Sequence, residues 1–138
     1  MADFDIDMRQ LEIFAQELED LERQFPKEAR QIMLRSGIKA KAIVMKKARQ
    51  LVRKKTGTYL KSIKRGKVWT EEGSYRVRVY TGVPHGHLIE YGHRIVDKSG
   101  NEHGFKEGYH VFDRAEKEIE HQWTEILAGE FDRIMKKI

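Results

Sequence analysis

The sequence predicts an α+β fold, in which long N-terminal helices and a C-terminal helix pack on a small antiparallel β-sheet. Two stretches, residues 27–55 and 110–136, repeat apolar residues with helical spacing. Between them, residues 75–80 alternate valine with arginine and tyrosine, which is typical of a strand with one buried face. A length of 138 residues favours a single domain over residues 1–138.

The first predicted helix covers residues 7–25. Its apolar face is formed by Leu11, Phe14, Ala15, Leu18, Leu21 and Phe25. We expect Asp5 or Asp7 to cap the N-terminus. The helix should end at Phe25, because a proline disfavours helical geometry in the residue before it. Pro26 in turn suits the first turn of the next helix.

The second predicted helix, residues 27–55, carries two apolar faces. The broad face holds Ala29, Ile32, Met33, Ala40, Ile43, Val44 and Leu51, and the narrow face holds Leu34, Ile38, Met45 and Val52. One such face is enough to hold a helix on its own core. We therefore expect the narrow face to pack against more of the same chain or against a neighbouring subunit. Ser36-Gly37 is expected to weaken or bend the helix.

The middle of the chain predicts a short helical turn followed by a β-hairpin. Thr56-Gly57 should end the long helix, and Thr58 can cap a turn over residues 59–63. The segments KVWT and YRVRVYTG are then predicted strands. Because the connecting EEGS is short and contains glycine, the strands should pair antiparallel.

The last third of the chain predicts a turn, a loop and a helix. Residues 84–92 suit a short helical turn that Gly92 ends. Residues 97–108, DKSGNEHGFKEG, are polar and glycine-rich without periodicity, which indicates a flexible loop. The final helix, residues 110–136, places Phe112, Ala115, Ile119, Trp123, Ile126 and Leu127 on one face.

Composition restricts the class of protein. Cysteine is absent, which excludes disulfides and thiolate metal sites and fits a reducing compartment. No apolar run approaches the length of a membrane span. The acidic N-terminus, MADFDIDMRQ, lacks the apolar core of a signal peptide. We therefore expect a protein that is made and kept in a cytoplasm and has no membrane partner.

Charge is divided into zones along the chain. Residues 1–25 carry 8 acidic and 2 basic side chains, residues 26–68 carry 1 and 15, and residues 69–138 carry 13 and 10. The net charges are −6, +14 and −3, within an overall +5. Such zoning indicates either an anionic partner or complementary charge on another subunit.

The basic residues of the second helix form a stripe between its two apolar faces. Its members are Arg35, Lys39, Lys46, Arg49 and Arg53. At the helical rise the stripe is roughly 27 Å long, so it could neutralise phosphates along a nucleic-acid backbone. Few aromatic residues interleave with it, which disfavours a platform for stacked bases. The alternatives are a solvated face, or pairing with the acidic N-terminal segment, within the chain or between subunits.

The stretch HLIEYGHR, residues 87–94, raises the possibility of a metal site. Candidate ligands in and beyond it are His85, His87, Glu90, His93, His103 and His110. Their spacing is not the HExxH pattern of metalloproteases, and no serine or threonine lies in a hydrolase motif. We favour hydrogen-bonding or solvent-facing roles, and expect no cofactor. A metal-dependent hydrolase that uses His87, Glu90 and His93 is the lesser alternative.

Three segments carry a family resemblance when taken in order. They are RKKTGTYLKSIKRGKV at 53–68, VPHGHLIEYGHR at 83–94 and GYHVFDRAEKEIE at 108–120. Together they resemble the tailed-phage neck and tail-completion proteins, a family of head–tail connector and tail-component proteins that prophages also encode. The matching positions are Thr56, Gly57, Leu60, Ser62, Ile63, His87, Leu88, Glu90, Tyr91, Gly92, His93, His110, Phe112 and Ala115. Residues 26–125 would form the family-like core, although GYHVFDRA lacks the prolines that many members have there.

The resemblance implies a structural, non-enzymatic morphogenesis protein at the head–tail junction. Expected partners are other neck, tail or connector proteins and further copies of the chain in a ring, with non-specific contact to packaged DNA. The protein would lie in the host cytoplasm during assembly and in the virion afterwards. A nucleic-acid-binding module built on the basic stripe is the alternative.

Within the matching motifs, the residues themselves suggest local roles. Gly57 and Gly92 should occupy left-handed or crowded backbone. Leu88 and Tyr91 should plug into the core. Glu90 should point outward or bond to a backbone group or a histidine, with His93 and His110 as possible partners of each other or of Glu90.

Overall fold

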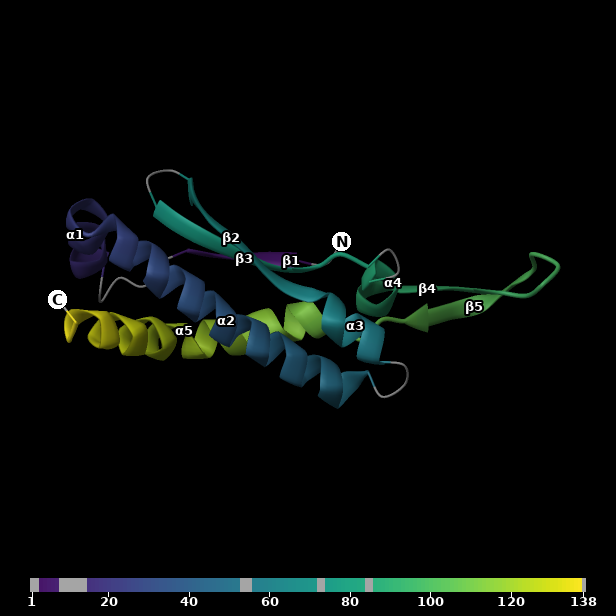
Figure 1. Cartoon of the computed structure of the whole chain (residues 1–138). Coiled ribbons are helices and arrows are strands. Elements are labelled where there is room, and N and C mark those ends of the chain that lie inside the picture. Colours follow the sequence, from purple (N-terminus) through teal and green to yellow (C-terminus); the bar gives the residue numbers. More distant parts are fainter. Residues whose placement is uncertain (1–2, 8–14, 53–55, 72–73, 84–85, 138) are drawn as a thin grey trace.

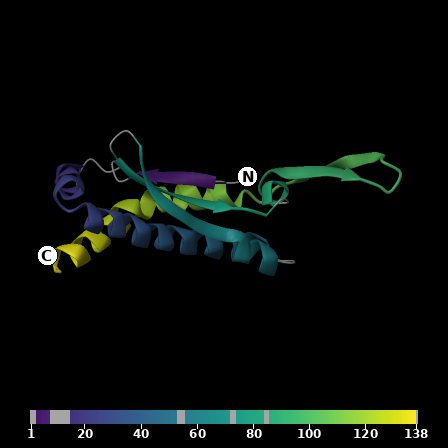
Figure 2. The same cartoon turned by 45° about the horizontal axis from the view of Figure 1, so that its top comes forward.

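The fold combines two antiparallel sheets with two long helices, so the predicted α+β class is confirmed. The computed structural model describes residues 3–7, 15–52, 56–71, 74–83 and 86–137. Helices α2 (Pro26–Leu51) and α5 (Val111–Met135) lie side by side under one face of a three-stranded sheet (Figure 1). A second, two-stranded sheet extends beyond this body, which gives the molecule an elongated shape (Figure 2).

The three-stranded sheet has β3 (Ser74–Thr81) at its centre and is ordered β1-β3-β2. Strand β2 (Ile63–Glu71) pairs antiparallel with β3, as the alternating pattern predicts, although it begins earlier than the predicted KVWT. It follows directly on the short helix α3 (Thr56–Ser62). Val77 and Val79 of β3 are fully buried beneath the helices, so the valine side of the alternation is the core side.

The predicted helix 7–25 is wrong at Asp7, which lies in a strand. Strand β1 (Asp3–Asp7) pairs antiparallel with β3, and the described part of the predicted helix is α1 (Ala15–Gln24), because residues 8–14 lie outside the described residues. Asp5 and Asp7, expected as helix caps, instead lie in a strand opposite Arg78 and Arg76. The sequence DFDID alternates polar and apolar residues, so a strand signal is present, but its pairing partner is about seventy residues away. Leu11 and Phe14, which were predicted on the apolar face of this helix, lie outside the described residues.

Helix α2 begins at Pro26, as predicted, and is capped at its end by Val52, whose N–H donates to the Ala48 carbonyl at 2.8 Å. Residues 53–55, the end of the predicted helix, lie outside the described part of the chain. The buried face consists of Ala29, Ile32, Met33, Ser36, Gly37, Ala40, Val44 and Ala48. A Cβ at Gly37 would lie 3.1 Å from both Arg65 and Val77 of the sheet. Ser36-Gly37 therefore allows the helix to approach the sheet closely.

The narrow apolar face of α2 is largely covered by the chain itself. Val52 is buried, and Leu34 and Met45 are partly buried against the core. Ile38 remains 53% exposed. A role of these four residues in assembly therefore stays a prediction that now depends mainly on Ile38.

Helix α5 completes the core opposite α2. Its buried face consists of Val111, Phe112, Ala115, Ile119, Trp123, Leu127, Glu130 and Ile134. The apolar members match the predicted face, except that Ile126 is only partly buried. Glu130 is an acid among them, and its partners lie on α2. No helix among the described residues is long and apolar enough to cross a bilayer.

The predicted loop 97–108 is wrong, because half of it forms a strand. Strands β4 (Gly92–Val96) and β5 (Glu102–Glu107) make an antiparallel hairpin that projects from the end of the body (Figure 1). The turn is closed by Asp97, whose Oδ1 accepts hydrogen bonds from the N–H groups of Ser99 and Asn101, both at 2.9 Å. The hydrogen bond from His103 and then those from the turn backbone lower the pKa of Asp97. A hairpin with solvent on both faces needs no apolar alternation, so the sequence carries no periodic signal for it.

The base of the hairpin is a close backbone crossing between the segments before and after it. The N–H groups of Tyr109 and His110 donate to the carbonyls of Ile89 and Glu90 at 2.8 and 3.1 Å. A Cβ at Gly108 would overlap the Glu90 carbonyl and the Gly92 nitrogen. Gly92 itself has φ +93°, as expected for the residue that ends a helix.

We expect Gly108→Ala to lower the free energy of unfolding by roughly 1–3 kcal/mol, because backbone atoms surround the added methyl group. Urea denaturation followed by circular dichroism measures the loss. Gly57→Ala is the matched control, since Gly57 lies in α3 with open space around its Cα. That control should be neutral or stabilising by up to about 1 kcal/mol. Equal stability of Gly108→Ala and the unmodified chain would contradict the crossing.

Candidate functional site

Glu90 is the centre of the HLIEYGHR motif, and its carboxylate binds the start of α5. Helix α4 (Gly86–Tyr91) carries Glu90, whose side chain is 1% exposed. Oε1 accepts a hydrogen bond from the Phe112 N–H at 2.8 Å, and Oε2 accepts one from the Asp113 N–H at 3.1 Å. The N-cap residue of α5, His110, makes no side-chain cap and has left-handed geometry with φ 52°. Glu90 therefore supplies from outside the helix the negative charge and the acceptors that its N-terminus requires.

Residues from all three motif segments belong to the surroundings of Glu90, Tyr59 through its side chain and Phe112 and Asp113 through their N–H groups. Tyr59 of α3 is buried, and burial followed by the charge of Glu90 raises the pKa of its phenol. Ser62, at the end of α3, shares a 2.6 Å hydrogen bond with the buried Thr81 of β3. Thr81 in turn lies against Gly86 of α4. A Cβ added at Gly86 would lie 2.8 Å from the methyl group of Thr81. The ordered motifs thus describe one packed junction between α3, β3, α4 and α5.

The structure corrects several expected roles within the motifs. Leu88 and Tyr91 were expected in the core but are 39% and 56% exposed, because α4 instead buries Gly86 and Glu90, four residues apart. Gly57 is neither crowded nor at positive φ, so the expected strain is wrong there. Leu60 is partly buried and Ile63 is buried. The Thr56 side chain lies outside the described atoms.

The histidines are spread over separate contacts. His93 Nδ1 lies 3.0 Å from the Arg94 carbonyl, His103 Nε2 lies 2.8 Å from Asp97, and His110 Nε2 lies 2.7 Å from Glu107. Within the described part of the chain, no three His, Asp or Glu side chains are grouped to hold a metal ion. His87 is exposed, and His85 lies outside the described residues. Of the alternatives expected for Glu90, the bond to a backbone group is confirmed.

Two of the five residues in the basic stripe of α2 pair with one acid on α5. Arg35 Nε and Lys39 Nζ contact the two oxygens of Glu130 at 2.8 and 2.9 Å, and Glu130 is 2% exposed. On the same side Lys47 contacts Glu118 at 2.9 Å. The stripe thus takes acidic partners from the C-terminal helix of the same chain, a pairing that the charge zones did not suggest. Lys46 and Arg49 stay exposed, and Arg53 lies outside the described residues.

Burial and pairing act in opposite directions on Glu130. Burial alone would raise its pKa, but the hydrogen bonds and positive charges of Lys39 and Arg35 outweigh burial and hold the pKa below its ordinary value. The carboxyl is therefore ionised at neutral pH, and it fixes α5 to α2 near the C-terminal end of α5.

Exposed apolar side chains gather on the projecting hairpin, a feature that sequence reasoning missed. Ile95 and Val96 on β4 are 43% and 53% exposed, and Phe105 on β5 is 58% exposed. Leu88 and Tyr91, at the hairpin base, add further exposed apolar surface. We refer to Ile95, Val96 and Phe105 as the hairpin apolar patch. In the sequence, the signal for this exposed apolar surface was the presence of isoleucine, valine and phenylalanine beside a polar, glycine-rich stretch.

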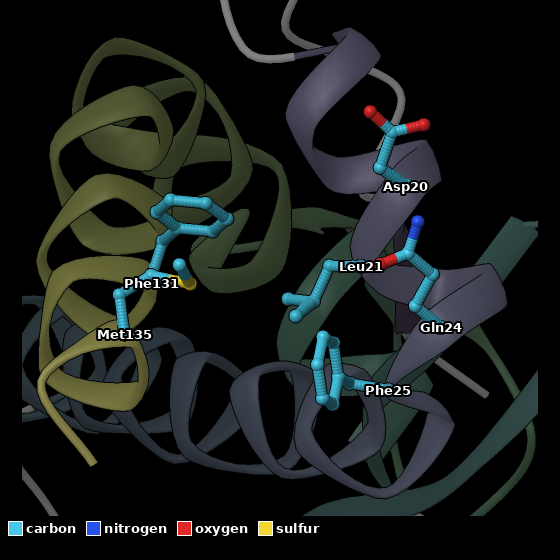
Figure 3. Close-up of a pocket in the computed structure, with 6 residues that line it drawn as sticks. All are labelled: Asp20, Leu21, Gln24, Phe25, Phe131 and Met135. Atoms are coloured by element: carbon cyan, nitrogen blue, oxygen red, sulfur yellow. The ribbon is translucent and has the colours of Figure 1, made fainter. Parts of the chain in front are cut away.

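An apolar groove lies between α1 and the C-terminal end of α5 (Figure 3). These two elements meet at the end of the molecule opposite the hairpin (Figure 1). The volume of the groove is about 210 Å³, and its lining residues are Asp20, Leu21, Gln24, Phe25, Phe131 and Met135. Figure 3 shows Phe25 and Leu21 facing Phe131 across the opening, with Asp20 and Gln24 along the α1 side. We refer to it as the terminal groove. A groove with apolar walls and a polar rim suits an apolar side chain of another protein segment.

We expect Glu90→Ala to lower the free energy of unfolding by about 2–4 kcal/mol, because two N–H groups at the start of α5 lose their acceptor. Glu90→Gln, which retains one carbonyl acceptor, should lose less. Glu120→Ala, at an exposed position on α5, is the control and should stay within about 0.5 kcal/mol of the unmodified chain. Chemical denaturation measures all three, and equal losses for Glu90→Ala and Glu120→Ala would contradict the capping role.

Glu130 should make stability depend on acid pH. Its pKa is lower in the folded chain than the ordinary value of about 4.3, so its contribution is present above that pH and is lost as pH falls through the folded value. Between about pH 5 and pH 3 the unmodified chain should therefore lose stability more steeply than Glu130→Gln. Denaturation series across this range measure the slopes, with Glu120→Gln expected to retain the original slope. Parallel curves for the chain and Glu130→Gln would refute the assignment.

Comparison with known proteins places the chain in a family, through a match that covers the first two motif segments and stops before the third. The family model described as "HK97-gp10_like: Bacteriophage HK97-gp10, putative tail-component" matches residues 12–92, more than half of the chain. The matched segment runs through α4 and ends at Gly92, where the projecting hairpin begins. No curated protein and no solved structure matches the chain.

Proposed function

The chain belongs to the HK97-gp10-like family of bacteriophage tail components, and from this premise we propose that it is a structural subunit of the head–tail junction. In this role it completes the neck or tail through assembly and performs no catalysis. Its partners are neighbouring neck, tail or connector proteins and further copies of itself in a ring. It acts in the host cytoplasm during assembly and remains in the mature virion.

The projecting hairpin is the observation that carries this proposal. Beyond Gly92, all residues of β4 and β5 are exposed, including the hairpin apolar patch. A two-stranded hairpin is at best marginally stable in water when nothing packs on it. Docking of the hairpin on another subunit would remove its apolar side chains from water, and this is the behaviour expected of an assembly element.

The packed motif junction supports a structural role for the residues of the HLIEYGHR stretch. Glu90, the obvious candidate for acid–base chemistry, has both oxygens occupied by backbone N–H groups. The imidazoles of His93, His103 and His110 are each engaged with a different neighbour. These residues therefore hold elements together, which fits a protein that works by its shape.

Contact with packaged DNA is a lesser part of the proposal. Arg35 and Lys39 already share a carboxylate partner, Glu130, so the stripe offers less free positive charge than its sequence implies. Lys46 and Arg49 are exposed on α2 and could face DNA in the channel of a ring. Such contact would be sequence-independent and would weaken with salt.

We expect a phage that carries an early stop codon in this gene to accumulate DNA-filled heads and separate tails. Electron microscopy of the lysate and the titre of infectious particles measure the defect. Supplying the unmodified chain from a plasmid should restore joined particles. His87→Ala should restore them equally well, since His87 is exposed and the junction role assigns it no chemistry. A failure of His87→Ala alone would favour the hydrolase alternative. Normal joined particles without the chain would refute the junction role.

A further inference from the structure

The hairpin and the terminal groove have complementary apolar surfaces at opposite ends of one molecule (Figure 1). The hairpin presents Phe105, and the groove is walled by Leu21, Phe25, Phe131 and Met135. A cavity of about 150 Å³ with apolar walls is large enough to bind benzene. The groove, at about 210 Å³, can therefore receive one phenyl ring.

The charges of the two surfaces define how they would meet. The hairpin acids have partners close by: Glu102 contacts Arg94, Asp97 contacts His103, and Glu107 contacts His110. This pairing leaves the turn residue Lys98 without an acidic partner among the residues that the structure describes.

The two walls of the terminal groove differ in charge. Helix α1, Ala15–Gln24, contains four acidic residues and one arginine, whereas the end of α5 carries Arg133, Lys136 and Lys137. Lys98 at the hairpin turn should therefore lie on the α1 side of the groove and away from the end of α5.

We propose that the β4–β5 hairpin of one copy inserts into the terminal groove of the next copy, with Phe105 between α1 and α5 and Lys98 beside α1. The proposal depends on the subunit assembly proposed above and specifies its contact. Because the two surfaces differ and lie at opposite ends, the contact is heterologous and repeats head to tail. Such a contact closes into a ring when the rotation between copies permits.

Disulfide cross-linking can test this contact in assembled particles, because the chain contains no cysteine of its own. Phe105→Cys and Met135→Cys are introduced together; both positions are exposed, at 58% and 47%. After mild oxidation, gel electrophoresis without reductant should show a ladder of covalent multiples of the chain, which reductant collapses to one band. Each single variant should give no ladder. Phe105→Cys with Glu120→Cys, whose second site lies on an exposed part of α5, is the matched control and should also give none.

A charge change supplies a second measurement. Adding Lys98→Glu to the double-cysteine chain should reduce the yield of the ladder, because the tip would then meet acidic α1 with like charge. Adding Lys117→Glu, an exposed change elsewhere on α5, should leave the yield unchanged. Equal yields for these two variants would contradict the placement of Lys98.

Other outcomes separate this contact from the proposed function. Dimers from Phe105→Cys alone would show hairpin meeting hairpin and would overturn the head-to-tail contact. Joined particles that need the chain but give no ladder would overturn the contact and leave the junction role intact. Joined particles formed without the chain would overturn the junction role and this contact with it.

Discussion

The fold depends on the contact between the buried carboxylate of Glu90 and the first turn of helix α5. Helix α5 supplies half of the helical core, yet it begins after a left-handed His110 that provides no side-chain cap. Glu90 provides the missing acceptors from the neighbouring α4. The close crossing of Gly108 with the backbone of Glu90 and Gly92 holds the two segments in register for that contact. In this chain, Glu90 of the HLIEYGHR stretch therefore determines how a long helix starts after a projecting hairpin.

The uneven distribution of charge along the chain is largely resolved within one fold. The basic α2 is matched along α5 by Glu130 and Glu118. Charge that looks like a signal for an external partner thus contributes to joining segments that are far apart in the sequence. The pairs on partly exposed lysine and arginine side chains contribute modestly to stability, because solvent screens them.

The sequence predicts the elements whose burial follows a simple period. The faces of α2 and α5 and the β2–β3 hairpin follow from apolar spacing, because each buries one face against the core. Strand β1 is missed because its five residues gain their hydrogen bonds from a distant strand and the neighbouring helical pattern is longer. Strand β5 is missed because its surroundings are solvent, so nothing selects for alternation. Helix α4 forms where a helical turn was predicted, but it buries Gly86 and Glu90 and leaves Leu88 and Tyr91 exposed. The hydrogen bonds of Glu90 and the close packing at Gly86 decide which face of the helix turns inward.

The hairpin has a consequence for how relatives of this chain can diverge. It joins the body through a single pair of neighbouring backbone segments, and two of its acids, Glu102 and Asp97, have partners within the hairpin. Adding or removing residues in pairs near its tip would preserve the side on which each remaining side chain lies. Evolution can therefore adjust the length of this arm, and with it the spacing between neighbours, while the body that carries it keeps its sequence and shape.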